Sequence, residues 1–166
     1  MANGGAGANT PAPAALPHPI FIAQYAIVGH PRRTEHWSIM ALLSAKKARI
    51  FELTGNYDTF AYVNYETILA TDPRQHDARG GFLLCQISDE KLEWFANALK
   101  AIEVVRGTPD YDCQTWAMQA VRLLQDGGLV PRVVTERQIR EEMEVEKERW
   151  EVADDILLER LIAERS

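Results

Sequence analysis

The sequence has little of what marks several large classes of protein. Its 166 residues include only two cysteines, too few for a disulfide framework. No stretch contains the ~18 consecutive apolar residues that a membrane-spanning helix needs. Acidic residues outnumber basic ones, 24 to 18, so the surface lacks the positive charge typical of nucleic-acid-binding proteins. We therefore expect a globular protein that neither crosses a membrane nor binds nucleic acid.

The N-terminal segment also lacks the features of a secretory signal. Residues 1–19 are rich in alanine, glycine and proline and contain neither a basic start nor an apolar core. This composition buries too little apolar surface to offset the entropy of ordering, so we predict a disordered tail in which His18 is solvated. Without a signal or a disulfide framework, we expect a cytoplasmic protein with reduced cysteines.

Residues 20–133 have the pattern of one folded domain of the α+β class. Runs rich in β-branched and aromatic residues, separated by glycine, proline and polar residues, predict strands. Apolar residues at helical spacing predict one helix after Ser88 and another after Asp112. The predicted strands cover residues 20–28, 36–43, 48–53, 59–65 and 81–87.

Residues 134–166 form a separate acidic segment. Positions 135–166 hold eleven acidic and six basic residues, a balance of 6 − 11 = −5. The run Thr135-Glu136-Arg137-Gln138 is a capping box that opens a helix. We predict one long C-terminal helix whose thin apolar seam packs on the domain or pairs with a second copy in a homodimer. The seam consists of Ile139, Met143, Trp150, Ala153, Leu157 and Leu161.

Cys113 is the most informative residue, because it stands directly ahead of an amphipathic helix. A helix N-terminus offers unpaired N–H groups and a partial positive charge, and both favour the nucleophilic thiolate. The backbone N–H of Cys113 is a candidate donor to an oxyanion, and the Gln24 side chain is a candidate second donor to it. Cys85, in the apolar run 81–87, reads as a small buried hydrophobe.

A thiol nucleophile needs a base, and the base needs a group that orients it. His36 opens a predicted strand and is the candidate base. In an antiparallel hairpin with the next strand, Glu52 lies near His36, and we choose it because an imidazole N–H needs an acceptor. Thr54 and Asn56 stay open as alternatives, since a slip of one residue flips every side chain. The histidines and cysteines show no clustered ligand spacing, so we expect no metal and no cofactor.

These motifs resemble parts of a known superfamily. The run Asp112-Cys113-Gln114-Thr115-Trp116 is similar to the Asp-Cys-Ser-Gly helix start of NlpC-type papain-like peptidases, with Gln114-Thr115 in place of Ser-Gly. The run His36-Trp37-Ser38-Ile39 resembles the His-Trp-x-[Ile/Val] strand of lecithin–retinol acyltransferase-like proteins, where Glu52 replaces a second histidine. Histidine before cysteine is the order of the circularly permuted branch, which also includes PPPDE-type isopeptidases. Uncharacterised fungal domains of this superfamily look similar.

The resemblance covers about residues 20–130 and implies a permuted papain-like domain, with an antiparallel sheet packed on the helix that bears Cys113. It implies catalysis by Cys113, His36 and Glu52 on an unknown acyl, peptide or ester substrate. The expected reaction is hydrolysis or acyl transfer at an amide, isopeptide or ester bond through a thioester. The alternative is a catalytically silent module that dimerises or binds a partner through its C-terminal helix.

Overall fold

The computed structural model describes residue 7, residues 16–153 and residues 156–165. Most of the predicted disordered tail, residues 1–6 and 8–15, lies outside the described residues. The described chain is of the α+β class, as predicted, and forms a five-stranded antiparallel sheet in the order β4-β3-β2-β1-β5. The strands are β1 His18–Ala26, β2 Glu35–Leu42, β3 Lys47–Thr54, β4 Ala61–Ile68 and β5 Ala78–Ile87.

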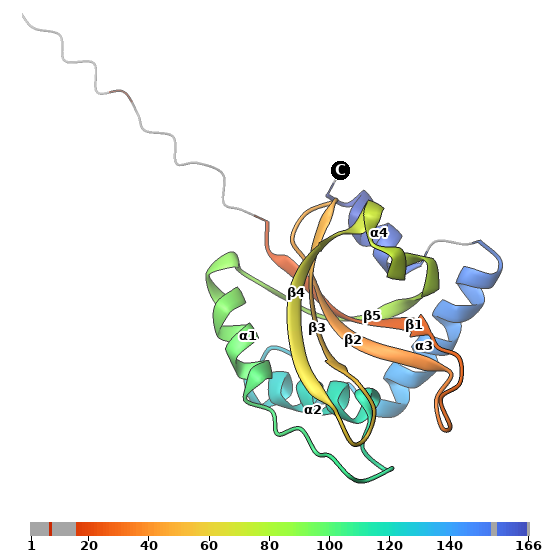
Figure 1. Ribbon diagram of the computed structural model, residues 1–166. Coiled ribbons are helices and arrows are strands. Elements are labelled where there is room, and N and C mark those ends of the chain that lie inside the picture. Colours follow the sequence, from red (N-terminus) through yellow and green to blue (C-terminus); the bar gives the residue numbers. More distant parts are fainter. Residues whose placement is uncertain (1–6, 8–15, 154–155, 166) are drawn as a thin grey trace, which may run out of the picture.

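Helices cover both faces of this sheet. Helices α1 (Leu92–Lys100) and α2 (Cys113–Asp126) lie against one face, where α3 (Glu136–Glu151) also contributes to the core. Helix α4 (Leu157–Ala163) lies against the opposite face (Figure 1). In the described part of the chain, no helix combines the length and the apolar character needed to cross a bilayer.

Covered faces explain why the central strands are apolar on both sides. In β1, Ile20 and Ile22 face the α1–α2 side, whereas Phe21 and Ala23 face the α4 side, and all four are buried. Residues on the central strand of a two-sided sheet meet a core in either direction, so an alternating polar pattern is absent. The edge strand β4 is largely exposed and carries more polar residues.

Strand β1 begins earlier than predicted. The prediction of a solvated tail histidine at position 18 is wrong: His18 pairs with Ile87 of β5, is only 8% exposed, and its Nε2 lies 2.9 Å from Asp89 Oδ1. The composition of residues 1–19 describes the segment as a whole. It carries no information about Ile87, the strand partner of His18, which lies 69 positions away.

The single long helix predicted over residues 134–166 is wrong, because the described part of this segment forms two helices. Thr135 does cap α3 through a capping box, but α3 ends at Glu151, and Ala153 has a φ of 54°. The ends of the apolar seam face different cores, since Ile139 and Met143 pack with α2 whereas Leu157 and Leu161 pack on the other sheet face. Four of the six seam residues are therefore buried within one chain, whereas Trp150 and Ala153 are exposed.

The buried carboxylate of Glu146 joins α3, α4 and β5. Its Oε1 accepts the N–H of Leu157, the first residue of α4, at 2.7 Å, and its Oε2 lies 3.0 Å from Arg149 Nη1. Helix α3 approaches β5 closely at this point, because a Cβ atom on Gly80 would lie 2.6 Å from Glu146 Cβ. Glu146, a charged residue in the middle of the predicted C-terminal helix, is therefore an internal anchor and not part of a solvated face.

We expect Glu146→Ala to lower the free energy of unfolding by about 2–4 kcal/mol, because it leaves buried donors without an acceptor. Chemical denaturation measures the loss, and hydrogen exchange should show faster exchange in α4. Glu148→Ala removes the same charge from an exposed position of the same helix and should cost less than about 0.5 kcal/mol. Equal losses in the two variants would contradict the anchoring role.

Candidate active site

The β2–β3 ladder pairs Ile39 with Phe51 through to Leu42 with Ala48, and His36 and Glu52 both lie beyond it. Their side chains meet there, with His36 Nε2 2.8 Å from Glu52 Oε2. A continued ladder in the same register would instead have placed Thr54 opposite His36. The structure therefore brings Glu52 to His36 at the point where this pairing stops.

The two alternatives to Glu52 are occupied elsewhere. The Thr54 hydroxyl donates to the Ala61 carbonyl oxygen at 3.4 Å, within the pairing of β3 and β4. The Asn56 side chain accepts the backbone N–H of Asp58 at 3.0 Å and so closes the turn that follows β3. Of the three candidates, Glu52 is the one that contacts the imidazole.

The N-terminus of α2 holds Cys113 at a fixed position. Asp112 is the N-cap, and its Oδ1 accepts the N–H groups of Gln114 and Thr115 at 3.0 Å each. Arg33 Nε lies 2.8 Å from Asp112 Oδ2; burial opposes ionisation, but this hydrogen bond holds the pKa of Asp112 below its usual value. As the first residue of α2, Cys113 has a backbone N–H with no partner inside the helix.

His36 lies between Cys113 and Glu52. Glu52 Oε2 lies 2.8 Å from the Nε2 atom, and the Cys113 side chain is close enough to the imidazole to raise its pKa. Burial favours the neutral imidazole, but the hydrogen bonds and negative charges of Cys113 and Glu52 outweigh it and raise the pKa of His36 to about 9. The arrangement therefore supports a protonated imidazole between Cys113 and Glu52 at neutral pH.

Two residues that sequence reasoning missed hold Glu52 in its ionised form. Arg74 Nη2 lies 3.0 Å from Glu52 Oε2, and the Tyr65 hydroxyl donates to Oε1 at 3.1 Å. Burial alone would raise the pKa of Glu52, but hydrogen bonds from His36 and Arg74 lower it to about 2. Arg74 also stacks over the Tyr25 ring, 4.7 Å from its centroid. The sequence contained only an indirect sign of Arg74: Glu52 lies in an apolar strand, and a carboxylate buried there needs a cationic partner.

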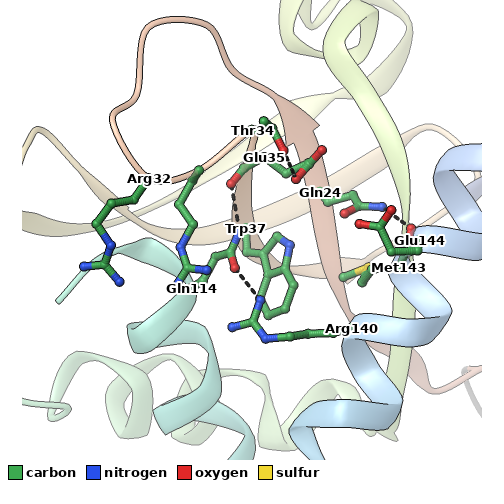
Figure 2. A pocket seen from close by; sticks show the side chains of 10 residues that line it. Gln24, Arg32, Thr34, Glu35, Trp37, Gln114, Arg140, Met143 and Glu144 are labelled. Carbon is green, nitrogen blue, oxygen red and sulfur yellow. Dashed lines mark hydrogen bonds between the residues drawn. The ribbon is translucent and has the colours of Figure 1, made fainter. Parts of the chain in front are cut away.

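Gln114 joins the neighbours of the two reactive residues. Its Nε2 donates to the carbonyl oxygen of Glu35, next to His36, at 3.0 Å, and its Oε1 accepts from Arg140 Nη1 of α3 at 2.7 Å. Figure 2 shows these two bonds, with the Arg140 guanidinium over the Trp37 ring. The residue that departs from the Ser-Gly pattern of the peptidases therefore fixes the helix tip against β2.

Gln24 does not serve the site as guessed. Its amide nitrogen donates to the carbonyl oxygens of Arg79 at 2.9 Å and Met143 at 2.7 Å, so both N–H bonds are used. It lines the small cavity of about 180 Å³ that is drawn in Figure 2. The only oxyanion donor that we retain is therefore the N–H of Cys113.

A pocket of about 410 Å³ opens beside Cys113. Cys113 is only 7% exposed, but it lines this pocket together with three loops. These are the β1–β2 loop, the turn after β3 and the segment that leads into α2. The pocket is large enough for a small molecule or a side chain to lie against Cys113.

The remaining cysteine and histidines have ordinary surroundings. Cys85 lies on β5, away from His36, and burial raises the pKa of its thiol to about 11. The His30 ring accepts the backbone N–H groups of Arg32 and Arg33, and His76 is exposed. Among the described residues, no group of three or more histidine, cysteine or acidic side chains could hold a metal ion.

Comparisons with family models, with curated proteins and with solved structures gave no match. We therefore describe this domain by its fold and by the geometry of its site. It is an α+β domain with a Cys–His–Glu cluster at a helix tip and a pocket beside the thiol.

The raised pKa of His36 predicts a stability that falls with pH in the alkaline range. The folded protein holds the imidazolium proton to about pH 9, whereas the unfolded chain releases it near 6.5. The stabilisation is complete below pH 6.5 and is lost as the pH rises to about 9. We expect wild type to lose more stability than His36→Asn across this range, because only wild type has an imidazole whose proton is held more tightly in the folded state. Urea denaturation at about pH 6 and pH 9.5 measures the difference, and parallel losses would contradict it.

The bridge made by Gln114 predicts an effect on Cys113 that stability alone does not explain. Gln114→Ala and Gln125→Ala each remove a glutamine of α2 whose side chain makes two hydrogen bonds to groups outside the helix, so each should cost about 1–3 kcal/mol. Only Gln114→Ala should slow the alkylation of Cys113 by iodoacetamide, roughly tenfold if the thiolate loses its imidazolium. An unchanged rate would show that Gln114 is structural only.

Proposed function

We propose that the protein is a thiol-dependent hydrolase or acyltransferase that acts on an amide, isopeptide or ester bond through a thioester. Cys113 is the nucleophile, His36 is the base and acid, and Glu52 orients the imidazole. The observation that carries the proposal is the succession from Cys113 through His36 to Glu52, with Cys113 at the wall of a pocket.

The cluster accounts for each proton in this reaction. The Cys113 thiolate attacks the carbonyl carbon, and the N–H of Cys113 donates to the oxyanion that forms. The imidazolium of His36 gives its proton to the leaving nitrogen or oxygen as the carbon–heteroatom bond breaks, which leaves the acyl group on sulfur. Neutral His36 then takes a proton from water or from an acceptor alcohol or amine, which attacks the thioester. Release of the product returns the thiolate and the imidazolium.

Glu52 supports both halves of this cycle without itself taking up a proton. A carboxylate with a pKa of about 2 stays ionised at neutral pH, so it orients the imidazole and stabilises the imidazolium. Arg74 and Tyr65 hold that carboxylate from the other side. They are positioning residues, because they act on the imidazole only through Glu52.

We place the domain over residues 20–133 with the permuted papain-like proteins as part of this proposal. Two features support the placement: a cysteine at the tip of a helix that packs on an antiparallel sheet, and a histidine that precedes it in the chain on a strand of that sheet. A reducing compartment such as the cytoplasm would keep Cys113 as a free thiol.

Alkylation of Cys113 tests the proposed thiolate–imidazolium pair. At about pH 6 we expect iodoacetamide to modify Cys113 at least tenfold faster than free cysteine, whose thiol has a pKa of ~8.5. Peptide mass spectrometry assigns the site, and Cys85→Ala should leave the rate unchanged. His36→Ala should remove the advantage, whereas His76→Ala, at an exposed histidine, should not. A Cys113 that reacts no faster than free cysteine would point to the catalytically silent module.

A further inference from the structure

The pocket beside Cys113 is richer in aromatic rings than thiol chemistry requires. Phe60 and Tyr111 are each only 6% exposed, and their ring centroids lie 6.3 Å apart in an edge-to-face arrangement. Tyr57 lines the same pocket and is 49% exposed, which is unusual for a large ring. Pro31 and Pro109 add further apolar surface. Exposed aromatic surface in a concave site is typical of ligand recognition.

The aromatic wall is held in place by hydrogen bonds between its loops. The Tyr57 carbonyl oxygen accepts the N–H of Gly107 at 2.7 Å, and the Phe60 carbonyl oxygen accepts from Arg106 Nε at 2.7 Å. Within the turn, Thr59 Oγ1 accepts the N–H of Asn56 at 3.0 Å. The pocket is therefore largely formed before a ligand arrives, which lowers the entropy cost of binding.

The place of the catalytic residues decides which half of a substrate fills the pocket. Among the described residues, Cys113 lines the pocket and His36 does not. The leaving group must lie within reach of His36, because the imidazolium gives it a proton. The group in the pocket is therefore attached to the carbonyl carbon, on the acyl side of the bond.

The charges at the pocket, which Asp58 and Asp112 also line, disfavour an acyl group that carries a carboxylate. Arg32 lines the pocket, but its guanidinium bonds the Pro109 carbonyl oxygen and lies 3.9 Å from Asp110 and 3.8 Å from Asp112. Asp112 in turn is paired with Arg33. Arg32 is thus already engaged and is not free to bind a carboxylate carried by the acyl group.

We propose that the pocket selects substrates whose acyl group carries a neutral aromatic ring close to the scissile carbonyl. A flat ring can make edge-to-face contacts with Phe60 and Tyr111, which an extended alkyl chain cannot. The volume of about 410 Å³ falls in the range of small-molecule sites. This inference rests on the proposed function, since it assigns the acyl side of the same reaction.

The test compares acylation of Cys113 by three 4-nitrophenyl esters: acetate, 3-phenylpropionate and dodecanoate. Each rate is divided by the rate of the same ester with N-acetylcysteine, and intact mass confirms the acyl–enzyme. We expect the normalised rate for 3-phenylpropionate to exceed that for acetate roughly tenfold or more, and to exceed that for dodecanoate. Tyr57→Ala and Phe60→Leu should bring the ratio of 3-phenylpropionate to acetate close to one. Tyr57 is half exposed, so its replacement leaves the fold intact.

Trp94→Ala is the matched control, because it removes an equally exposed ring from α1 and should leave the ratio unchanged. Equal normalised rates for the three esters, or a preference for dodecanoate, would overturn the inference and leave the proposed function standing. A loss of the preference in Trp94→Ala would also overturn the inference. If no ester acylates Cys113, the proposed function fails and the inference falls with it.

Discussion

The ionised carboxylate of Glu52 is the constraint from which the rest of the site follows. A buried charge without partners costs several kcal/mol. Because Glu52 is almost fully buried, the fold must supply partners to both of its carboxylate oxygens. Three segments do so: His36 from β2, Tyr65 from β4 and Arg74 from the loop before β5. The pairing of β2 and β3 stops before it reaches His36 and Glu52. Beyond this point, His36 contacts Glu52 and also interacts with Cys113.

A second constraint sets the distance between helix and strand. Gln114 follows the cysteine and bonds the backbone of Glu35, which precedes the histidine, so one side chain couples the two reactive residues through their neighbours. Arg140 holds the other end of that amide and lies over Trp37. Helix α3 thus contributes to the site without lining the pocket beside the thiol. The site depends on contacts between segments that are far apart in sequence.

Local patterns predicted the five strands, the helix after Asp112 and the Thr135 cap of α3, because turn residues, apolar periodicity and capping chemistry are encoded over a few positions. The same patterns brought forward Cys113, His36 and Glu52, which the structure places together, while their catalytic roles stay predictions. Arg74 and Gln114 were missed because their partners lie 22 and 79 positions away. His18, Gln24 and the C-terminal helix were misread for the same reason: strand pairing and close approach at Gly80 are not local.

The anchor at Glu146 has a consequence for the order in which the chain assembles. The first N–H of α4 finds its acceptor on α3, and α3 approaches β5 closely only because Gly80 has no side chain. Helix α4 is too short to be stable alone in water. Its docking must therefore follow that of α3, which in turn requires a formed β5. Helix α4 closes the second core only after the first is built, so this core is complete only once residues 157–163 have been added.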